Sequence, residues 1–119
     1  MNFKRADRVA ELIMVEMSDI IFKQVKDPRV HAITITSVKV SDDLRNAKIY
    51  FVELGKDECS PEIMAGLNNA KTFVRRELGK RLKLRFIPEI MFVHDKSFGY
   101  GNRIENLLAE IARQEKSND

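Results

Sequence analysis

The stretch AITITSVKVSDDLRNAKIYFVEL, residues 32–54, decides the fold. In its first part, residues 32–40, isoleucine alternates with threonine and the apolar residues then change parity, which indicates a β-strand with a bulge or a change of face near Ser37. Residues 47–54 are apolar on both faces, so we expect a second strand at the centre of a sheet. The polar turn at residues 41–46 is short, and the two strands are therefore predicted to form an antiparallel hairpin.

Helical patterns lie on both sides of this hairpin. Across residues 5–25, apolar side chains recur at the spacing of one helix face, and Pro28 marks the end of that helix. After the hairpin, a helix is predicted over residues 60–70, with its serine as the N-cap. A second helical pattern follows over residues 73–82.

A third strand is predicted at residues 84–94. Pro88 has no N–H to donate, so this strand is expected at the edge of the sheet. A right-handed crossover through the helices makes it parallel to the second strand. A last helix, capped by Asn102 and running to about Arg113, precedes a frayed tail. The predicted fold is therefore α+β, in the order α-β-β-α-α-β plus a C-terminal helix, with one sheet face covered by helices and the other partly open.

Length and composition favour a single globular domain in the cytoplasm. The chain has 119 residues, of which 44% are hydrophobic and 33% charged, a balance typical of globular domains. No apolar run is long enough to cross a bilayer, and the charged N-terminus lacks the apolar core of a signal peptide. The only cysteine, Cys59, excludes an internal disulfide and agrees with a reducing compartment. We expect a cytoplasmic protein that does not act at a membrane.

A concentrated basic block, KTFVRRELGKRLKLR at residues 71–85, is the strongest functional signal. It carries a net charge of +6 in a chain whose net charge is +3. On a helical wheel, Arg76, Lys80 and Lys83 form a stripe opposite the apolar face, which suits contacts to phosphates. The alternative is a solvated surface that pairs with acidic residues elsewhere in the fold. The predicted RNA-binding residues are Lys71, Arg75, Arg76, Lys80, Arg81, Lys83 and Arg85, with possible secondary contacts from Lys4, Arg5 and Arg8.

Catalytic and metal sites find little support. His94 and Asp95 are adjacent at a strand end, where a hydrolase or nuclease would need a nucleophile or a third group that the sequence does not supply. His31 and Cys59 have no partners at metal-ligand spacing. The Asp42-Asp43 pair offers too few oxygens for a cation site and suits a turn. We therefore predict no catalytic residue, no metal and no cofactor.

Three segments resemble ribosome-binding factor A of bacteria. They are KDPRV (residues 26–30), TITSVKVSDDLRNAKIYFV (34–52) and RRELGKRLKLRFIPEIMFVHDKS (75–97), and the resemblance extends over about residues 5–108 in order and spacing. It implies a type II KH-like fold and a monomer that is not an enzyme. It also implies a factor that binds free small (30S) ribosomal subunits and 16S rRNA, acts in late maturation and 5′-end processing of that rRNA, and supports growth in the cold.

The resemblance also implies a helix-kink-helix in place of the GxxG loop of ordinary KH domains. The family's Ala-x-Gly kink corresponds to Ala70-Lys71-Thr72 here. Threonine resists the positive φ that glycine allows, so we expect no residue at positive φ in this junction. Residues 1–95 are expected to form the RNA-binding domain, and residues 96–119 a C-terminal helix and flexible tail. The competing hypothesis is a protein-interaction module whose open sheet face binds an acidic partner.

Overall fold

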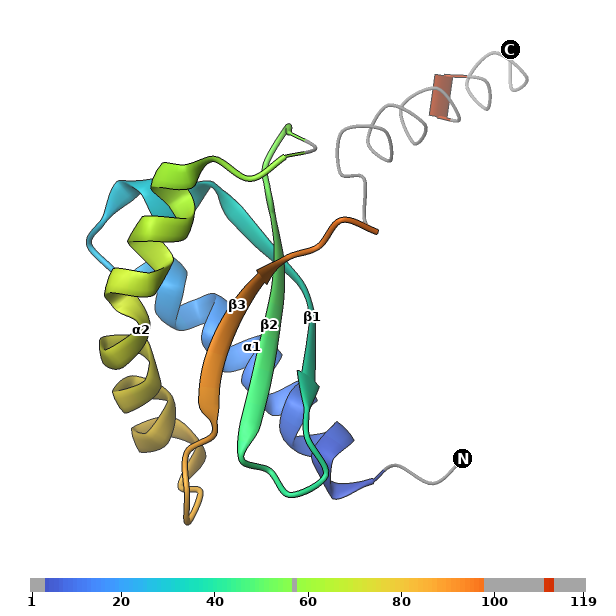
Figure 1. The fold of residues 1–119 in the computed structure, drawn as a ribbon, viewed down its shortest axis with the longest axis vertical. Coiled ribbons are helices and arrows are strands. Elements are labelled where there is room, and N and C mark those ends of the chain that lie inside the picture. Colours follow the sequence, from blue (N-terminus) through green and yellow to red (C-terminus); the bar gives the residue numbers. More distant parts are fainter. Residues whose placement is uncertain (1–3, 57, 98–110, 113–119) are drawn as a thin grey trace.

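The computed structural model describes residues 4–56, 58–97 and 111–112. The sheet has three strands, and Figure 1 shows the helices packed on one of its faces. The predicted last helix, from Asn102 to about Arg113, lies outside the described residues apart from 111–112. In chain order the elements are α1 (Arg5–Lys23), the short 3-10 helix η1 (Pro28–Ala32), β1 (Ile33–Val40), β2 (Asn46–Glu53), α2 (Pro61–Leu82) and β3 (Glu89–His94).

The sheet has the topology that the sequence predicts. Its strand order is β1-β2-β3, so β2 is the central strand and β3 an edge strand. The pairing of β1 with β2 is antiparallel, and its register shifts between Ile35 and Ser37, where the bulge was expected. The pairing of β2 with β3 is parallel and places Asn46 beside Glu89. The starts of β2 and β3 therefore lie next to each other.

The third strand is shorter than predicted. It begins at Glu89 rather than at residue 84. Lys83, in a left-handed conformation with φ 51°, ends α2 and turns the chain away from the helix. Pro88, which is fully buried and has no N–H for a ladder, stands just before the first paired residue. Residues 84–87 are therefore a loop between α2 and β3.

The two helices expected after the hairpin are one helix. α2 runs from Pro61 to Leu82 without interruption. The junction Ala70-Lys71-Thr72 keeps helical backbone angles, since Leu44 and Lys83 are the non-glycine residues with positive φ in the described part of the chain. The prediction of no positive φ at this junction is confirmed, and the prediction of a helix boundary there is wrong. Alanine and lysine favour helix, and a single threonine does not offset them.

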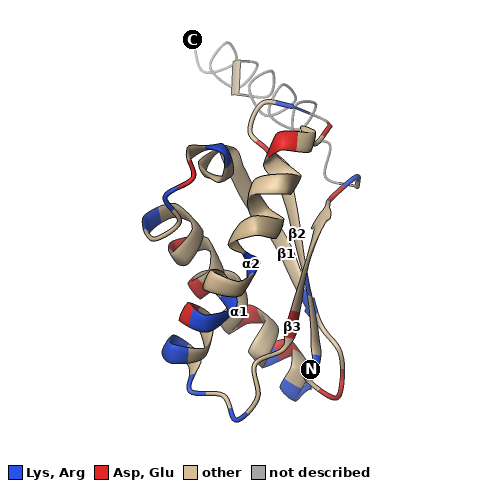
Figure 2. Cartoon of the chain, turned by 60° about the vertical axis from the view of Figure 1, so that its left-hand side comes forward, with Lys and Arg blue, Asp and Glu red and all other residues tan. Residues whose placement is uncertain are grey.

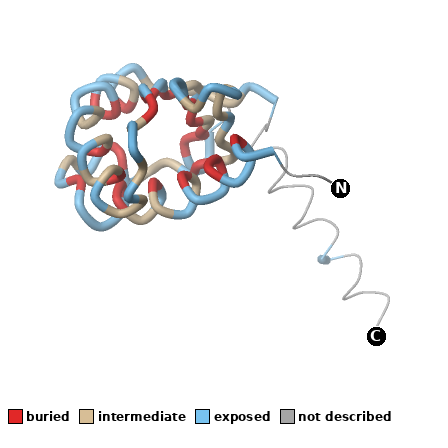
Figure 3. The backbone as a smooth tube through the Cα atoms, turned by 90° about the horizontal axis from the view of Figure 1, so that it is seen from below, coloured by how far each residue is buried: buried red, intermediate tan, exposed pale blue. Residues whose placement is uncertain are grey.

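The core lies between the sheet and the two long helices. Figure 3 shows the buried residues lining the space between these layers. Ile13, Met17 and Ile20 of α1 and Leu78 of α2 are fully buried, as is Phe51 of β2. α1 packs against β1, and α2 packs against α1 and β3. The outward face of α2 is consequently free to carry charge.

A buried carboxylate fixes the N-terminus of α2. Ser60 is the N-cap residue, but its hydroxyl donates to Glu53 Oε2 over 2.8 Å instead of accepting from the helix. The Ser60 N–H donates to the same oxygen over 3.1 Å. Burial opposes ionisation of Glu53, yet these hydrogen bonds and the Lys56 ammonium, 3.3 Å from Oε1, together hold the pKa of Glu53 below its ordinary value. α2 is thereby tied to the end of β2.

Candidate nucleic-acid interface

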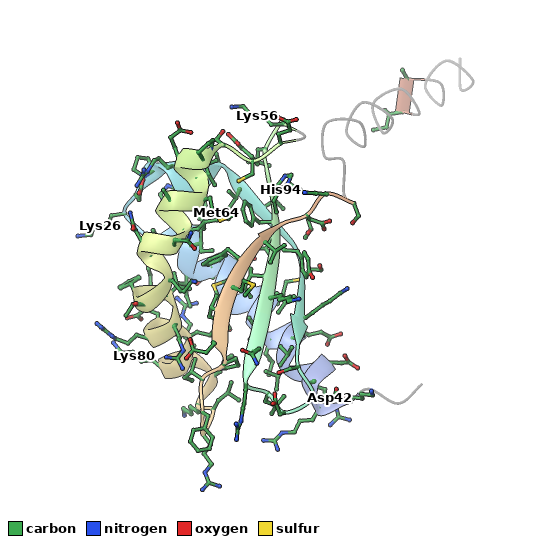
Figure 4. All side chains as sticks on the ribbon, viewed as in Figure 1. Lys26, Asp42, Lys56, Met64, Lys80 and His94 are labelled. Atoms are coloured by element: carbon green, nitrogen blue, oxygen red, sulfur yellow. The ribbon has the colours of Figure 1, made fainter. Side chains whose placement is uncertain are left out.

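Three basic residues on the outward side of α2 form a surface that we call the outer stripe: Arg76, Lys80 and Lys83. All three are exposed, and Figure 4 shows Lys80 projecting away from the domain. Figure 2 shows lysines and arginines gathering along the lower part of α2 and the loop that follows it. In the described residues Arg76 and Lys83 have no ion-pair partner, and Lys80 Nζ lies 3.3 Å from Glu77 Oε1 one turn away. Because Lys80 itself is exposed, this pair leaves the lysine available to a phosphate.

The last residue of the outer stripe has an unusual backbone. Lys83 is the C-cap of α2, with φ 51° and ψ 37°, and its N–H donates to the Gly79 carbonyl over 3.2 Å. Glycine is the usual residue in this left-handed position, because a side chain there raises the backbone energy. Because lysine is less stable than glycine in this conformation, its presence indicates that the positive charge of Lys83 matters for function rather than for stability.

Arg75 turns inward toward the start of β3. Its Nε donates to the Pro88 carbonyl over 3.1 Å, and its Nη2 donates to the Ile87 carbonyl over 2.8 Å. The same Nη2 lies 3.2 Å from Glu89 Oε1. Arg75 therefore holds the loop between α2 and β3 against the helix.

Arg81 turns inward on the opposite flank of α2, toward α1. Its Nη1 donates to Glu16 Oε2 over 2.9 Å and to Asp19 Oδ2 over 2.7 Å. Hydrogen bonds from Arg81 and then from Lys23 hold the pKa of Asp19 below its ordinary value. We call Arg75 and Arg81 the bracing arginines. The sequence left open that basic residues of this block pair with acidic residues elsewhere in the fold. Arg75 and Arg81 do so in the structure.

The remaining predicted contact residues differ in exposure. Lys71 is partly buried on α2, and Arg85 is exposed in the loop after it. The Arg85 guanidinium carbon lies 5.5 Å from the centre of the Phe86 ring. Lys4, Arg5 and Arg8 are exposed at the start of α1. The structure thus brings Arg85, Phe86 and the N-terminal Arg5 together as lining residues of one hollow. The outer stripe comes just before this loop in the chain.

His94 and Asp95 occupy structural positions. The His94 ring packs edge-on against Phe51 at 6.0 Å between centroids, and its buried Nε2 has no hydrogen-bond partner among the described residues. Asp95 accepts from Thr36 Oγ1 over 2.6 Å and from the Ser97 N–H over 3.0 Å. Asp95 therefore caps the loop that follows β3. No cluster of three or more metal-ligating side chains occurs within residues 4–56, 58–97 and 111–112.

Two residues near the basic block escaped the sequence analysis. Arg45 lies in the hairpin turn and Phe86 in the loop before β3, and both line the hollow next to Arg85. The signal that connects them is the parallel pairing of β2 with β3, which brings the segments preceding both strands to one edge of the sheet.

None of the helices that the structure describes has the length and apolar character that a bilayer span requires.

Comparison with known proteins agrees with this architecture. A family model described as ribosome-binding factor A matches residues 5–108. Ribosome-binding factor A of Syntrophus aciditrophicus (strain SB) is 55% identical over 116 residues, which cover 98% of this chain and 94% of that relative. The chain belongs to the ribosome-binding factor A family. The resemblance seen in the three sequence segments is therefore confirmed.

Solved structures of family members share the fold. The crystal structure of ribosome-binding factor A from Thermus thermophilus aligns with a TM-score of 0.66 at 18% identity, covering 75% of this chain and 94% of that one. A homology model of the T. thermophilus factor, fitted into a cryo-EM map of a 30S complex, aligns with a TM-score of 0.60 at 19% identity over 71% and 88% of the two chains. The fold is KH-like, as predicted.

Proposed function

We propose that this protein is an rRNA-binding assembly factor of the small ribosomal subunit. It binds free 30S subunits and 16S rRNA in the cytoplasm, and it supports late maturation and 5′-end processing of that rRNA and growth in the cold. Family membership supports this function, as does the T. thermophilus relative that was fitted into a map of a 30S complex. The mechanism is binding, and the protein catalyses no reaction.

The outer stripe is the observation that carries the proposal. Its cations project from a helix whose position is fixed by the core, by Glu53 at one end and by the bracing arginines on both flanks. A rigid helix that presents exposed positive charges at intervals of three and four residues suits successive phosphates of a structured RNA. We propose that the outer stripe, Lys71 and Arg85 contact RNA directly, and that Lys4, Arg5 and Arg8 extend this surface.

The two predicted parts of the chain have separate roles in this proposal. Residues 1–95 form the RNA-binding domain, and residues 96–119 form an accessory helix and tail. Arg75 and Arg81 belong to the RNA-binding surface as groups that position it. Because His94 packs against Phe51, its replacement by alanine is expected to leave subunit binding near normal.

Co-sedimentation tests the proposed function. The full chain is mixed with free 30S subunits or with complete ribosomes and centrifuged through sucrose, and we expect it to travel with the free subunits alone. A pulldown from cell extract, with and without ribonuclease, separates RNA binding from the protein-interaction hypothesis. Loss of the captured material after ribonuclease supports the proposal. Capture of an acidic protein that survives ribonuclease, together with no co-sedimentation, would overturn it.

A further inference from the structure

A hollow of about 600 Å³ lies at the lower end of the domain. Figure 1 shows that the turn between β1 and β2 and the loop between α2 and β3 both reach this end, and Figure 4 places Asp42 of that turn there. The walls come from three places in the chain: the hairpin turn, the loop of residues 84–87 and the first turn of α1. Their meeting follows from the parallel register of β2 and β3.

Three arginines line this hollow, one from each wall: Arg5, Arg45 and Arg85. In the part of the chain that the structure describes, none of their guanidinium groups has an ion-pair partner. Two acidic residues also line the hollow, fewer than the arginines, and their carboxylates have hydrogen-bond or ion-pair partners of their own. Asp43 accepts from Ser41 Oγ over 2.6 Å and from the Arg45 N–H over 3.0 Å, and Glu89 faces Arg75. The hollow therefore favours an anion.

The rim of the hollow carries an exposed aromatic ring. Phe86 is 75% exposed, the most exposed large hydrophobic residue in the described part of the chain. The Arg85 guanidinium carbon lies over its ring, 5.5 Å from the ring centre. An aromatic face next to arginines is the combination on which proteins stack an unpaired nucleobase while they bind its phosphates. A double helix has no free base face to offer, so the combination selects single-stranded RNA.

The backbone around the hollow is held in place. The Glu89 N–H donates to the Arg45 carbonyl over 2.8 Å, which joins the hairpin turn to the start of β3. Two left-handed residues shape these segments: Leu44 in the hairpin turn, with φ 62°, and Lys83 just before residues 84–87, with φ 51°. Arg75 holds the Ile87 and Pro88 carbonyls from the helix side. A preorganised site of this kind loses less conformational entropy when it binds than a loose loop would.

The geometry points to a binding site for an unpaired nucleotide of RNA in this hollow, with the base stacked on Phe86 and the flanking phosphates bound by Arg5, Arg45 and Arg85. The site rests on the proposed RNA-binding function and adds to it. The outer stripe contacts backbone phosphates without regard to base pairing, whereas this hollow requires a base that has left its helix.

The sequence contains no tryptophan, so a single introduced tryptophan can report on the site by its fluorescence. In Phe86→Trp the indole replaces the exposed ring, and the probe is hexaadenylate RNA. We expect the oligonucleotide to quench the fluorescence of this tryptophan, and a duplex of the same length to quench it far less. The matched control is Phe73→Trp, at a residue that is 38% exposed on α2 beside the outer stripe. Quenching there is expected to be weaker with hexaadenylate than at position 86.

Affinity measurements separate stacking from charge. Phe86→Ala and Phe86→Leu are expected to weaken hexaadenylate binding about tenfold without changing its salt dependence. Arg85→Gln is expected to weaken binding and to lower the log–log salt slope by about 0.7. Because Phe86 is exposed, thermal melts of the Phe86 variants should match that of the original chain.

The outcomes distinguish this inference from the proposed function. If the Phe86→Ala chain binds hexaadenylate as tightly as the original, or if the original chain does not bind hexaadenylate, the nucleotide site is overturned. Retained co-sedimentation with 30S subunits in that case leaves the proposed function standing. If the original chain fails to bind 30S subunits as well, the proposed function falls with it. Quenching at position 86 by duplex and hexaadenylate alike would also contradict the site.

Discussion

The outer stripe and the bracing arginines come from the same segment of the chain and do different things. Arg76 and Lys80 point away from the domain, whereas Arg75 and Arg81 make their hydrogen bonds to other parts of the fold. Arg75 and Arg76 are sequence neighbours, yet one contacts the loop before β3 and the other faces solvent. A basic block in a sequence is therefore not a single surface, because the helix distributes it over three sides.

The chemistry of the side chains matches this division. Each bracing arginine uses its planar guanidinium to reach more than one acceptor: Arg75 binds two carbonyls, and Arg81 binds two carboxylates. Arginine suits such fixed geometry because its donors lie in one plane. Lysine, a mobile point charge, supplies two of the three residues in the outer stripe. Stability should consequently respond to the bracing arginines, and RNA affinity to the outer stripe.

Removing a bracing arginine is expected to give the largest change in stability. Arg75→Ala leaves the Ile87 and Pro88 carbonyls without their charged donor and should lower the free energy of unfolding by about 2 kcal/mol. Urea denaturation followed by circular dichroism measures the change. The matched control is Arg76→Ala, on the neighbouring outward position, which should change stability by less than about 0.5 kcal/mol. If Arg75→Ala and Arg76→Ala lowered the free energy of unfolding equally, the distinction between bracing arginines and outer stripe would not hold.

A smaller change of opposite sign is expected at Lys83. Replacing it by glycine relieves the left-handed backbone and should stabilise the fold by up to about 1 kcal/mol, while it removes one charge from the outer stripe. Lys80→Gln removes one charge without backbone relief. Both variants should bind 30S subunits more weakly, but only Lys83→Gly should melt at a higher temperature. A Lys83→Gly chain that is less stable than the original would assign the lysine a structural role.

The contact between Arg81 and α1 predicts a small effect that depends on pH. Because the folded-state pKa of Asp19 lies below the ordinary value of 3.8, the stability from this contact is present above that value and is lost as the pH falls through the folded-state pKa. Melting temperatures of the Arg81→Gln chain should fall below those of the original above about pH 5. The gap should narrow below pH 4. A gap that stays constant down to pH 3 would exclude Asp19 as the responsible partner.

Local signals in the sequence were enough to predict the sheet. Alternation of apolar residues located β1, its change of parity located the bulge before Ser37, and Pro88 marked β3 as an edge strand. The predicted start of β3 was five residues too early because residues 84–87 have strand-like composition. Their conformation depends on the left-handed turn at Lys83 and on Arg75, neither of which shows in the composition. The expected boundary near Thr72 came from dividing the helical pattern there and from the family kink, although the alanine and lysine at that junction favour helix.

The sequence was enough to predict where the candidate site lies, but not which of its basic residues face solvent and which bind other parts of the fold. The helical wheel separated the outer stripe from the apolar face correctly. It did not show that Arg81 meets Glu16 and Asp19, which lie more than 60 residues earlier in the chain. Phe86 escaped notice because a lone phenylalanine in an apolar stretch is normally a core residue. Its exposure became visible only once the loop had been placed.

The salt dependence of binding to 30S subunits tests the central claim most directly. The log–log salt slope is measured for the original chain, for the triple variant Arg76→Gln, Lys80→Gln, Lys83→Gln, and for the double variant Arg75→Gln, Arg81→Gln, at a temperature where circular dichroism shows all three folded. If the outer stripe contacts phosphates and the bracing arginines do not, the triple variant lowers the slope by about 2 to 3 and the double variant leaves it unchanged. A slope that is unchanged in the triple variant, or that falls equally per charge in both variants, would contradict this account.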